Sequence, residues 1–201
     1  KLVANDPTEF SFFADSIALS KDVLVSGADL GSVPELGAAG AAYVFRRSGT
    51  SWTQEAKLIA SNPALGAGFG SGTAVVNDNT VAIGAAGAKR SGLVYLFGRR
   101  GGVWSEQAQL EPSSPEEGQG FGINLGISKN SLVVGAPFAN GFGQLRTGVA
   151  YVYRRIGDAW MEEARLVPSE TQARLFGTRV AISGSTIVAG APFTDDFANP
   201  E

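Results

Sequence analysis

A repeated pattern constrains the fold of this chain more than any other feature of its sequence. The chain has three tryptophans, Trp52, Trp104 and Trp160, separated by 52 and 56 residues. An aromatic run with paired arginines precedes each tryptophan, and a short polar segment ending in leucine follows it. The runs occupy residues 43–47, 95–100 and 151–155, and the segments occupy residues 54–58, 106–110 and 162–166. Self-similarity at a period near 50 residues indicates one supersecondary unit per repeat.

Glycine-rich segments provide a second set of matches. They lie at residues 25–28, 83–86, 134–137 and 189–192. A phenylalanine precedes the glycine of each segment by 14 or 15 residues, and the last three of these phenylalanines are followed directly by glycine. They are Phe13, Phe69, Phe121 and Phe176. The repeat therefore runs through the whole chain.

Each unit predicts four short strands. The first pair covers residues 17–20 and 23–25, joined by a tight turn at Ser-Lys-Asp. A third strand runs through residues 43–45 and reverses at Ser48-Gly49 into a fourth strand that begins at the tryptophan. No segment has a convincing apolar period of 3.6 residues, so helix should be nearly absent. Four antiparallel strands repeated radially predict an all-β fold, a β-propeller whose phenylalanines pack between blades.

Two of the repeats carry a family resemblance. Phe121-Gly122 with Gly135-Ala136-Pro137, and Phe176-Gly177 with Gly190-Ala191-Pro192, resemble the FG-GAP repeat of integrin α subunits and of many bacterial and algal surface proteins. The resemblance covers essentially the whole chain, although the first two repeats depart from it, at Phe13-Ala14 and Ala28-Asp29 in the first and at Ala85-Ala86 in the second. It implies a β-propeller of four-stranded antiparallel blades.

The repeat boundaries predict three complete blades plus partial terminal blades. The expected units are residues 1–11 (the last strand of a preceding blade and its loop), 12–62, 63–113 and 114–168 (three blades), and 169–201 (the first half of a further blade). Open ends leave unpaired strand edges, which favours a place within a larger propeller. The alternative is a closed ring of four blades whose last blade lacks one strand.

Composition excludes several classes of function. The formal net charge is −3, from 16 basic and 19 acidic residues among 201, which is too small to favour nucleic-acid binding. The chain has no cysteine and no histidine, so thiol and imidazole nucleophiles, histidine general bases and the usual zinc and copper ligands are missing. No apolar run approaches the length of about 18 residues that spans a bilayer. We therefore expect no nucleic-acid partner, no direct membrane insertion, no cofactor and no catalytic residues.

The sequence predicts no metal site and no enzyme site. The resemblance would imply Asp-rich calcium loops between the first two strands, but here the richest of these hairpins is Asn77-Asp78-Asn79, too short and too poor in carboxylates. Residues 66–72 are rich in glycine but lack the Lys-Ser/Thr of a phosphate loop. The carboxylate pair Glu116-Glu117 is a conceivable glycosidase pair, but nothing in the sequence places it in a cleft.

The connections between second and third strands are the candidate binding sites, because their lengths differ while the strands around them stay alike. They cover residues 29–39, 86–91, 138–147 and 193–201. The resemblance implies that they share one face with the loops before each phenylalanine. The candidate ligand-binding residues are Asp29, Glu35, Lys89, Arg90, Phe138, Asn140, Phe142, Arg146, Asp195 and Asp196. The alternative is ordinary loop packing.

The paired arginines recur once per blade, at residues 46–47, 99–100 and 154–155. A ring of cations is one way to hold sulfated or uronic glycans. Alternatively, the pairs are solvated strand ends that face glutamates of the next strand, such as Glu55 or Glu162.

These features favour a non-catalytic adhesion or recognition module, extracellular or at the cell surface, that presents loops to a protein or glycan ligand. One alternative is a structural propeller that docks within a larger assembly, by self-association or against the remainder of a longer chain. A carbohydrate-active enzyme domain that uses carboxylates is the third hypothesis.

Overall fold

The computed structural model describes residues 1–7, 11–33, 36–77, 79–141, 146–169 and 173–194, with the side chains of residues 74–77, 173 and 194 left aside. Every regular element among them is a β-strand. No helix within these ranges is long and apolar enough to cross a membrane. The prediction of an all-β chain without helix is confirmed for this part of the protein.

Three four-stranded antiparallel sheets follow one another along the chain. The first sheet contains β1 (Ile17–Ser20), β2 (Val23–Ala28), β5 (Ala41–Ser48) and β6 (Ser51–Leu58). The second contains β7 (Phe69–Asn77), β8 (Thr80–Ala85), β9 (Leu93–Arg100) and β10 (Val103–Leu110). The third contains β11 (Asn124–Ser128), β12 (Ser131–Ala136), β13 (Val149–Ile156) and β14 (Ala159–Leu166). Each fourth strand begins one residue before its tryptophan.

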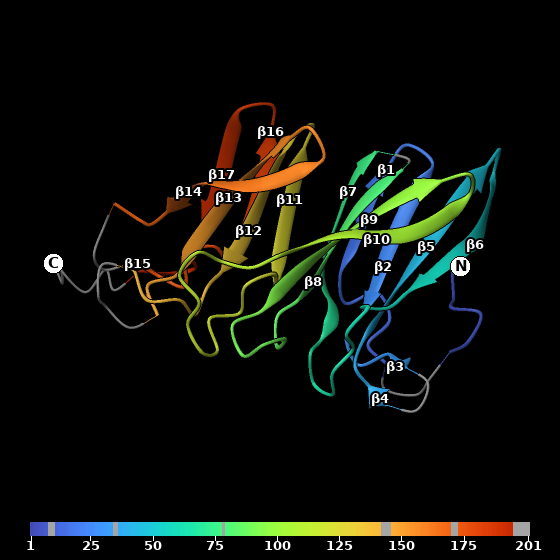
Figure 1. Cartoon of the computed structure of the whole chain (residues 1–201), viewed down its shortest axis with the longest axis horizontal. Helices are drawn as coiled ribbons and strands as arrows, with labels where there is room; N and C mark the ends of the chain where they lie inside the picture. The colour runs from blue at the N-terminus through green and yellow to red at the C-terminus, as the bar shows by residue number, and fades with distance from the viewer. Residues whose placement is uncertain (8–10, 34–35, 78, 142–145, 170–172, 195–201) are drawn as a thin grey trace, which may run out of the picture.

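Three two-stranded sheets complete the structure. β16 (Arg179–Ser183) and β17 (Thr186–Gly190) repeat the first hairpin of a blade. β3 (Ser32–Val33) pairs with β4 (Gly37–Ala38) inside the connection between β2 and β5. β15 (Ala173–Arg174) pairs with β18 (Phe193–Thr194) beside the last hairpin. Figure 1 shows the sheets side by side in chain order, from the N-terminal sheet on the right to the C-terminal hairpin on the left.

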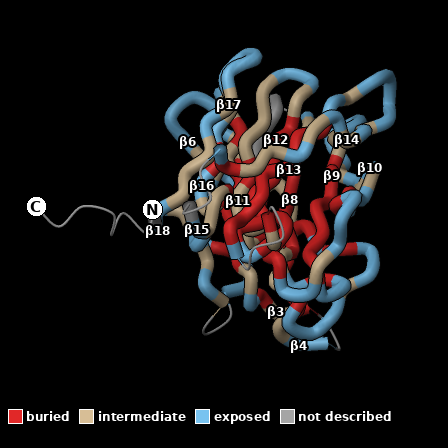
Figure 2. Tube along the Cα trace, turned by 90° about the vertical axis from the view of Figure 1, so that its left-hand side faces the viewer, coloured by how far each residue is buried: buried red, intermediate tan, exposed pale blue. Residues whose placement is uncertain are grey.

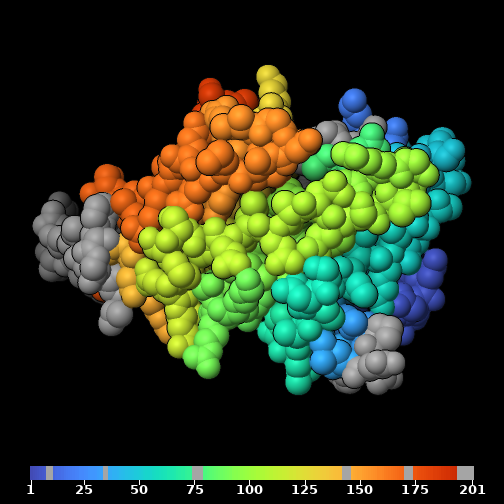
Figure 3. Space-filling view, in the orientation of Figure 1, coloured from blue at the N-terminus to red at the C-terminus, as the bar shows by residue number. Residues whose placement is uncertain are grey.

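The first strands of all four units converge. A cavity of about 320 Å³ is lined by residues of β1, β7, β11 and β16, among them Leu19, Thr73, Leu125 and Val180. The fourth strands lie outermost, and in Figure 3 the yellow-green residues of β10 lie on the surface between the cyan first sheet and the orange third sheet. This radial arrangement is that of propeller blades, as the sequence predicted.

The second sheet buries both faces against its neighbours, so residues of one strand serve two cores. Tyr95 and Phe97 of β9 pack with residues of the first sheet. Val94 and Leu96, which alternate with them, pack with residues of the third sheet. Side chains one residue apart in a strand point to opposite faces, and this accounts for the division. Figure 2 shows the result as a buried interior running through β8, β9, β12 and β13, with exposed turns at its ends.

The phenylalanines of the first three repeats, Phe13, Phe69 and Phe121, each pack edge-on against two aromatic rings of the third strand in their own blade. Phe69 lies 5.2 Å from Tyr95 and 6.0 Å from Phe97 between ring centroids. Phe121 makes the same contacts with Tyr151 and Tyr153, at 5.4 and 6.1 Å. Edge-to-face pairs add about 0.5–1.5 kcal/mol each beyond the area that they bury. The prediction that these phenylalanines lie between blades is therefore confirmed at Phe69 and Phe121, which are fully buried in the inter-blade cores.

In the three four-stranded sheets, the glycine of the second strand is required by the next unit. A Cβ built on Gly84 would lie 1.9 Å from the carbonyl oxygen of Gly122, the glycine that follows Phe121. Gly27 meets Gly70 and Gly135 meets Gly177 in the same way, at 2.0 and 2.1 Å. Backbone therefore packs directly on backbone at every junction, and a side chain has no space there.

Replacing Gly84 with alanine should lower the free energy of unfolding by about 3 kcal/mol or more, because neither backbone segment can move away from the added methyl group. Gly101→Ala is the matched control, since Gly101 has a φ of 57° but a Cβ added there would meet no atom within 4 Å. Left-handed strain alone should cost about 1 kcal/mol there. Urea unfolding of both variants measures the difference, and an equal loss would contradict the packing argument.

Candidate functional site

The connections at one end of the blades contact each other. We call this end the loop face, and it consists of the links between second and third strands together with the links between successive blades. The N–H of Gly66 donates to Ala38 O at 3.2 Å, Gly118 N–H to Arg90 O at 2.7 Å, and Leu175 N–H to Arg146 O at 3.1 Å. The two kinds of loop therefore share one face. The tight turns within the hairpins form the opposite end, which we call the hairpin face.

Lys89 and Arg90 lie at the tip of the connection between β8 and β9. Lys89 forms an ion pair with Glu111, and Arg90 Nη1 lies 3.6 Å from Glu117 Oε1. Both basic residues adopt left-handed backbone conformations, with φ of 46° and 64°. Non-glycine residues rarely adopt this conformation, and the surrounding structure must hold them in it.

The connection between β12 and β13 is fixed by hydrogen bonds to Asn140. Asn140 N–H donates to Glu116 Oε2 at 2.9 Å, and its side-chain Oδ1 accepts from Arg146 N–H at 3.1 Å. Its carbonyl oxygen accepts a hydrogen bond of 2.8 Å from Arg165 Nη2. The Arg146 guanidinium lies over the Phe138 ring, 5.9 Å from the centroid, which is a cation–π contact.

A segment of the blade-to-blade link joins these two loops. The N–H of Gly118 donates a hydrogen bond to Arg90 O. The backbone carbonyl of the next residue, Gln119, accepts a hydrogen bond of 3.1 Å from Phe138 N–H. Gln119 is completely buried, so it anchors this segment to the core. Five of the predicted residues therefore lie on one continuous surface. We call it the loop patch, and it comprises Lys89, Arg90, Phe138, Asn140 and Arg146 with the acidic residues Glu111, Glu116 and Glu117.

The other predicted residues do not join the loop patch. Asp29 lies in the first blade, where its Oδ1 atom is buried and has no hydrogen-bond partner within the described ranges. Burial, and then the charge of Asp15, raises the pKa of this carboxyl group. Four predicted residues lie outside the described part of the chain. They are Glu35, Phe142, Asp195 and Asp196.

Sequence reasoning missed the acidic half of the loop patch. It considered Glu116 and Glu117 only as a glycosidase pair, whereas the structure uses them to bind Asn140 and Arg90. Their place in the loop before Phe121, together with the expectation that these loops share a face, was the signal available. Within the ranges that the structure describes, no three acidic side chains form a group that could hold a metal ion.

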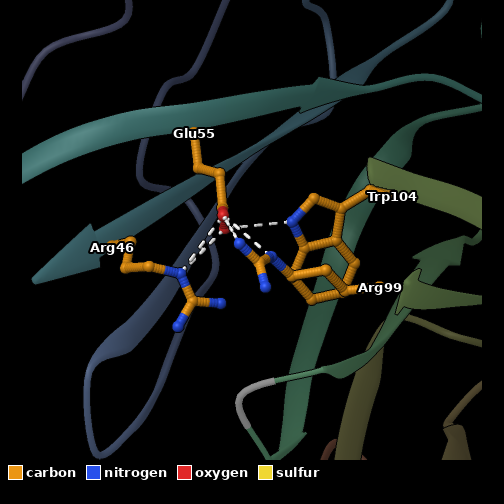
Figure 4. A network of polar contacts seen from close by, with 4 residues as sticks. All are labelled: Arg46, Glu55, Arg99 and Trp104. Atoms are coloured by element: carbon orange, nitrogen blue, oxygen red, sulfur yellow. Dashed lines mark hydrogen bonds and ion pairs between the residues drawn. The ribbon is translucent and has the colours of Figure 1, made fainter. Parts of the chain in front are cut away.

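The paired arginines lie toward the hairpin face, where a β-bulge positions their partner. The pairing between β5 and β6 skips Glu55, so its side chain is turned out of the regular ladder. Its carboxylate accepts hydrogen bonds from Arg46 Nε at 3.1 Å, Arg99 Nε at 2.8 Å and Trp104 Nε1 at 3.1 Å. Arg99 and Trp104 belong to the second sheet, so this Glu55 cluster links two blades (Figure 4).

The prediction that arginines face Glu55 is confirmed, but the same prediction for Glu162 is wrong. Glu162 accepts hydrogen bonds from the backbone and hydroxyl of Ser113. The bulged residue next to it, Glu163, pairs with Arg154 instead, at 3.0 Å. A shift of one residue at the bulge decides which glutamate reaches the arginine.

Comparison with known proteins gives one result. The FG-GAP repeat family model matches residues 1–45, 52–97, 104–153 and 160–201. No curated protein matches the chain significantly. The matches from residue 52 onward start at or beside a fourth-strand tryptophan, and those at 52–97 and 104–153 continue into the third strand of the next sheet. Family repeats and sheets are therefore offset by one strand.

Replacing Glu55 with glutamine should lower the free energy of unfolding at pH 7 by about 2 kcal/mol, because hydrogen bonds to a charged group are lost inside a half-buried cluster. Burial raises the pKa of Glu55, but hydrogen bonds from Trp104, Arg99 and Arg46 outweigh it and hold the pKa below its usual 4.5. A lowered folded pKa means that the stabilisation is complete above pH 4.5 and disappears as the pH falls through the folded value.

Urea unfolding between pH 7 and pH 3 measures this effect. Glu163→Gln is the matched control, because Glu163 pairs with one arginine in an exposed position and should contribute less than about 1 kcal/mol. A Glu55→Gln deficit that stays constant down to pH 3 would show that the charge of Glu55 is not its source.

Proposed function

Since the chain belongs to the FG-GAP repeat family, whose repeats generally take part in ligand binding and adhesion, we propose that it is a recognition module that binds a protein ligand through the loop patch. FG-GAP repeat domains are typically non-catalytic, and we extend this to the present chain. We also propose a location outside the cell or at its surface, where adhesion takes place.

The observation that supports this proposal is the rigid presentation of exposed charges of both signs. The side chains of Arg90 and Glu117 are 80% and 75% exposed. Exposed ion pairs contribute little to stability, so the fold does not depend on them. A partner with complementary charges would bind this surface with greater specificity and associate with it faster.

The backbone conformation of the loop patch also supports a binding role. Lys89, Arg90 and Arg146 all have positive φ. Each costs about 1 kcal/mol relative to an ordinary conformation, and such strain is often found at ligand-binding loops. The hydrogen bonds of Arg90 O and Asn140 Oδ1 hold these conformations before any ligand arrives, which lowers the entropy cost of binding.

Phe138 and Arg146 form the centre of the proposed contact. Phe138 remains 38% exposed although its backbone is tied to Gln119. An aromatic ring with a stacked guanidinium provides apolar area and directed hydrogen-bond donors together. Aromatic residues and arginine are both enriched in protein–protein interfaces, and arginine is also enriched among the residues that contribute most to binding energy.

The double substitution Phe138→Ala/Arg146→Ala should weaken binding to the native partner at least tenfold, because it removes the aromatic anchor and its cation. The partner is obtained by chemical cross-linking of the wild-type chain on intact source cells and identified by mass spectrometry. Its affinity is then measured by biolayer interferometry with the purified partner, before and after enzymatic deglycosylation.

Ile156→Ala/Lys129→Ala is the control, since it removes one exposed apolar side chain and one cation from the hairpin face. It should bind like the wild type. If deglycosylation abolishes binding, the ligand is a glycan and not a protein surface. Equal affinity for the wild type and the loop-patch variant would refute the proposed site.

A further inference from the structure

A cavity of about 310 Å³ lies between the second and third sheets, toward the hairpin face and away from the loop patch. The second sheet contributes residues of β9 and β10, and the third contributes the end of β13, its turn and the start of β14. The lining residues that matter here are Gly98, Arg100, Gln107, Arg155, Asp158 and Trp160. We call this cavity the junction pocket.

The same position between the first and second sheets is filled by the Glu55 cluster. In the repeat, Gln107 takes the place of Glu55 as the bulged residue of the fourth strand. Arg155 takes the place of Arg99, and Trp160 takes the place of Trp104. The third sheet therefore has an arginine and a tryptophan in the positions that bind the Glu55 carboxylate in the neighbouring junction. The second sheet has a glutamine where a carboxylate would be needed to bind them.

Two substitutions explain why the junction pocket is open. Gly98 stands where the first blade has Arg46, so one long side chain is missing. Gln107 turns back along its own strand, where Nε2 donates to Ser105 O at 3.1 Å and to Ser105 Oγ at 2.8 Å. It lies over Gly98, since a Cβ there would be 3.0 Å from Gln107 Cγ. The glutamine amide is therefore hydrogen-bonded within its own strand.

The two hydrogen-bond donors that the third sheet contributes, Trp160 Nε1 and the Arg155 guanidinium, have few acceptors within the chain. No described residue accepts a hydrogen bond from Trp160 Nε1, in contrast to Trp104. Arg155 donates to Gly157 O at 3.0 Å and lies 3.3 Å from Asp158 Oδ1. The Asp158 side chain is 94% exposed, so its attraction for Arg155 is strongly screened by water.

A further cation faces the junction pocket from the second sheet. Arg100 lies two residues after Gly98 in β9, so both residues belong to the face that packs toward the third sheet. The corresponding residue of the first blade is Ser48. Arg100 forms no ion pair with any described residue. Arg99 also lines the junction pocket, but it is paired with Glu55. Among the other charged residues of the lining, Asp158 is set against Arg100 and Arg155, which leaves an excess of one positive charge.

We propose that the junction pocket binds a single carboxylate group, from a small organic acid or from an acidic side chain of a docked protein. Arg155 and Trp160 Nε1 donate to its oxygens as Arg99 and Trp104 do to Glu55, and Arg100 supplies a second cation. A monoanion matches the charge of the pocket, and a planar carboxylate matches the fork of a guanidinium. This site is separate from the loop patch and does not depend on the function proposed for it.

Nuclear magnetic resonance of the indole N–H groups tests this proposal directly, because the chain has only three tryptophans. The Trp160 signal is assigned by its absence from Trp160→Phe. Titration with propionate, or with a capped Gly-Glu-Gly peptide, should shift the Trp160 signal saturably. The Trp104 signal should stay in place, since Glu55 already occupies that position. Tighter binding of the peptide than of propionate indicates a protein side chain as the source, and the reverse order indicates a free acid.

Two variants define the expected chemistry. Arg155→Gln should weaken binding of the tighter probe at least tenfold, whereas Arg154→Gln should not, because the neighbouring Arg154 pairs with Glu163 on the other face of β13. Gln107→Glu should abolish binding, because it supplies a carboxylate from within the chain, and it should move the Trp160 signal toward that of Trp104 without any ligand.

Sulfate and a capped Gly-Gln-Gly peptide at matched ionic strength serve as the control probes. Neither should shift the Trp160 signal at concentrations where the acids do. The proposal is overturned if the acids give no saturable shift of Trp160, if sulfate binds as tightly as they do, or if Arg155→Gln binds like the wild type.

Discussion

The contact of one backbone with another at each blade junction is the constraint on which the rest of this structure depends. The carbonyl oxygen of Gly122 would lie 1.9 Å from a Cβ on Gly84, so the two sheets approach as closely as their main chains permit. This distance fixes the inner edge of the junction, and the rings of Phe121, Tyr151 and Tyr153 then fill the space beyond it. The wedge between neighbouring sheets is thus set by glycine on the inside and by aromatic area further out.

The spacing of repeats could be read from the sequence because these contacts need particular residue types. Only glycine fits at the position of the second strand that meets the next blade. Only large rings fill the outer part of the wedge, so both residue types recur at fixed intervals. The first repeat departs from the pattern, yet Ala14 has a positive φ of 72°, as the glycines at the same position do, at 87° to 104°. Its turn is therefore kept at the cost of left-handed strain, which a motif search cannot see. The extra residue between Phe69 and Gly84 is likewise absorbed by a bulge in β7.

The side-chain partners were harder to predict, because they depend on register at a scale of one residue. Glu162 and Glu163 are adjacent and chemically identical, but the bulge sends one to Ser113 and the other to Arg154. The local sequence of the fourth strand does not predict that bulge. The loop patch presented a similar problem: its basic residues were identified from loop length and composition, whereas Glu116 acquires its role only when two loops from different repeats meet.

The bulged position of the fourth strand explains how junctions of one design come to differ in chemistry. A bulged residue takes no part in the ladder pairing, so its side chain can change without disturbing the strands around it. At this position Glu55 closes one junction with its own carboxylate, whereas Gln107, lying over Gly98, leaves the next junction open. The backbone contacts on the inside are the same in both cases. Because the glycine contacts and the aromatic wedge are common to both junctions, the outer part of a junction can be closed by the chain itself, as at Glu55, or, as we propose for the junction pocket, by a carboxylate from outside.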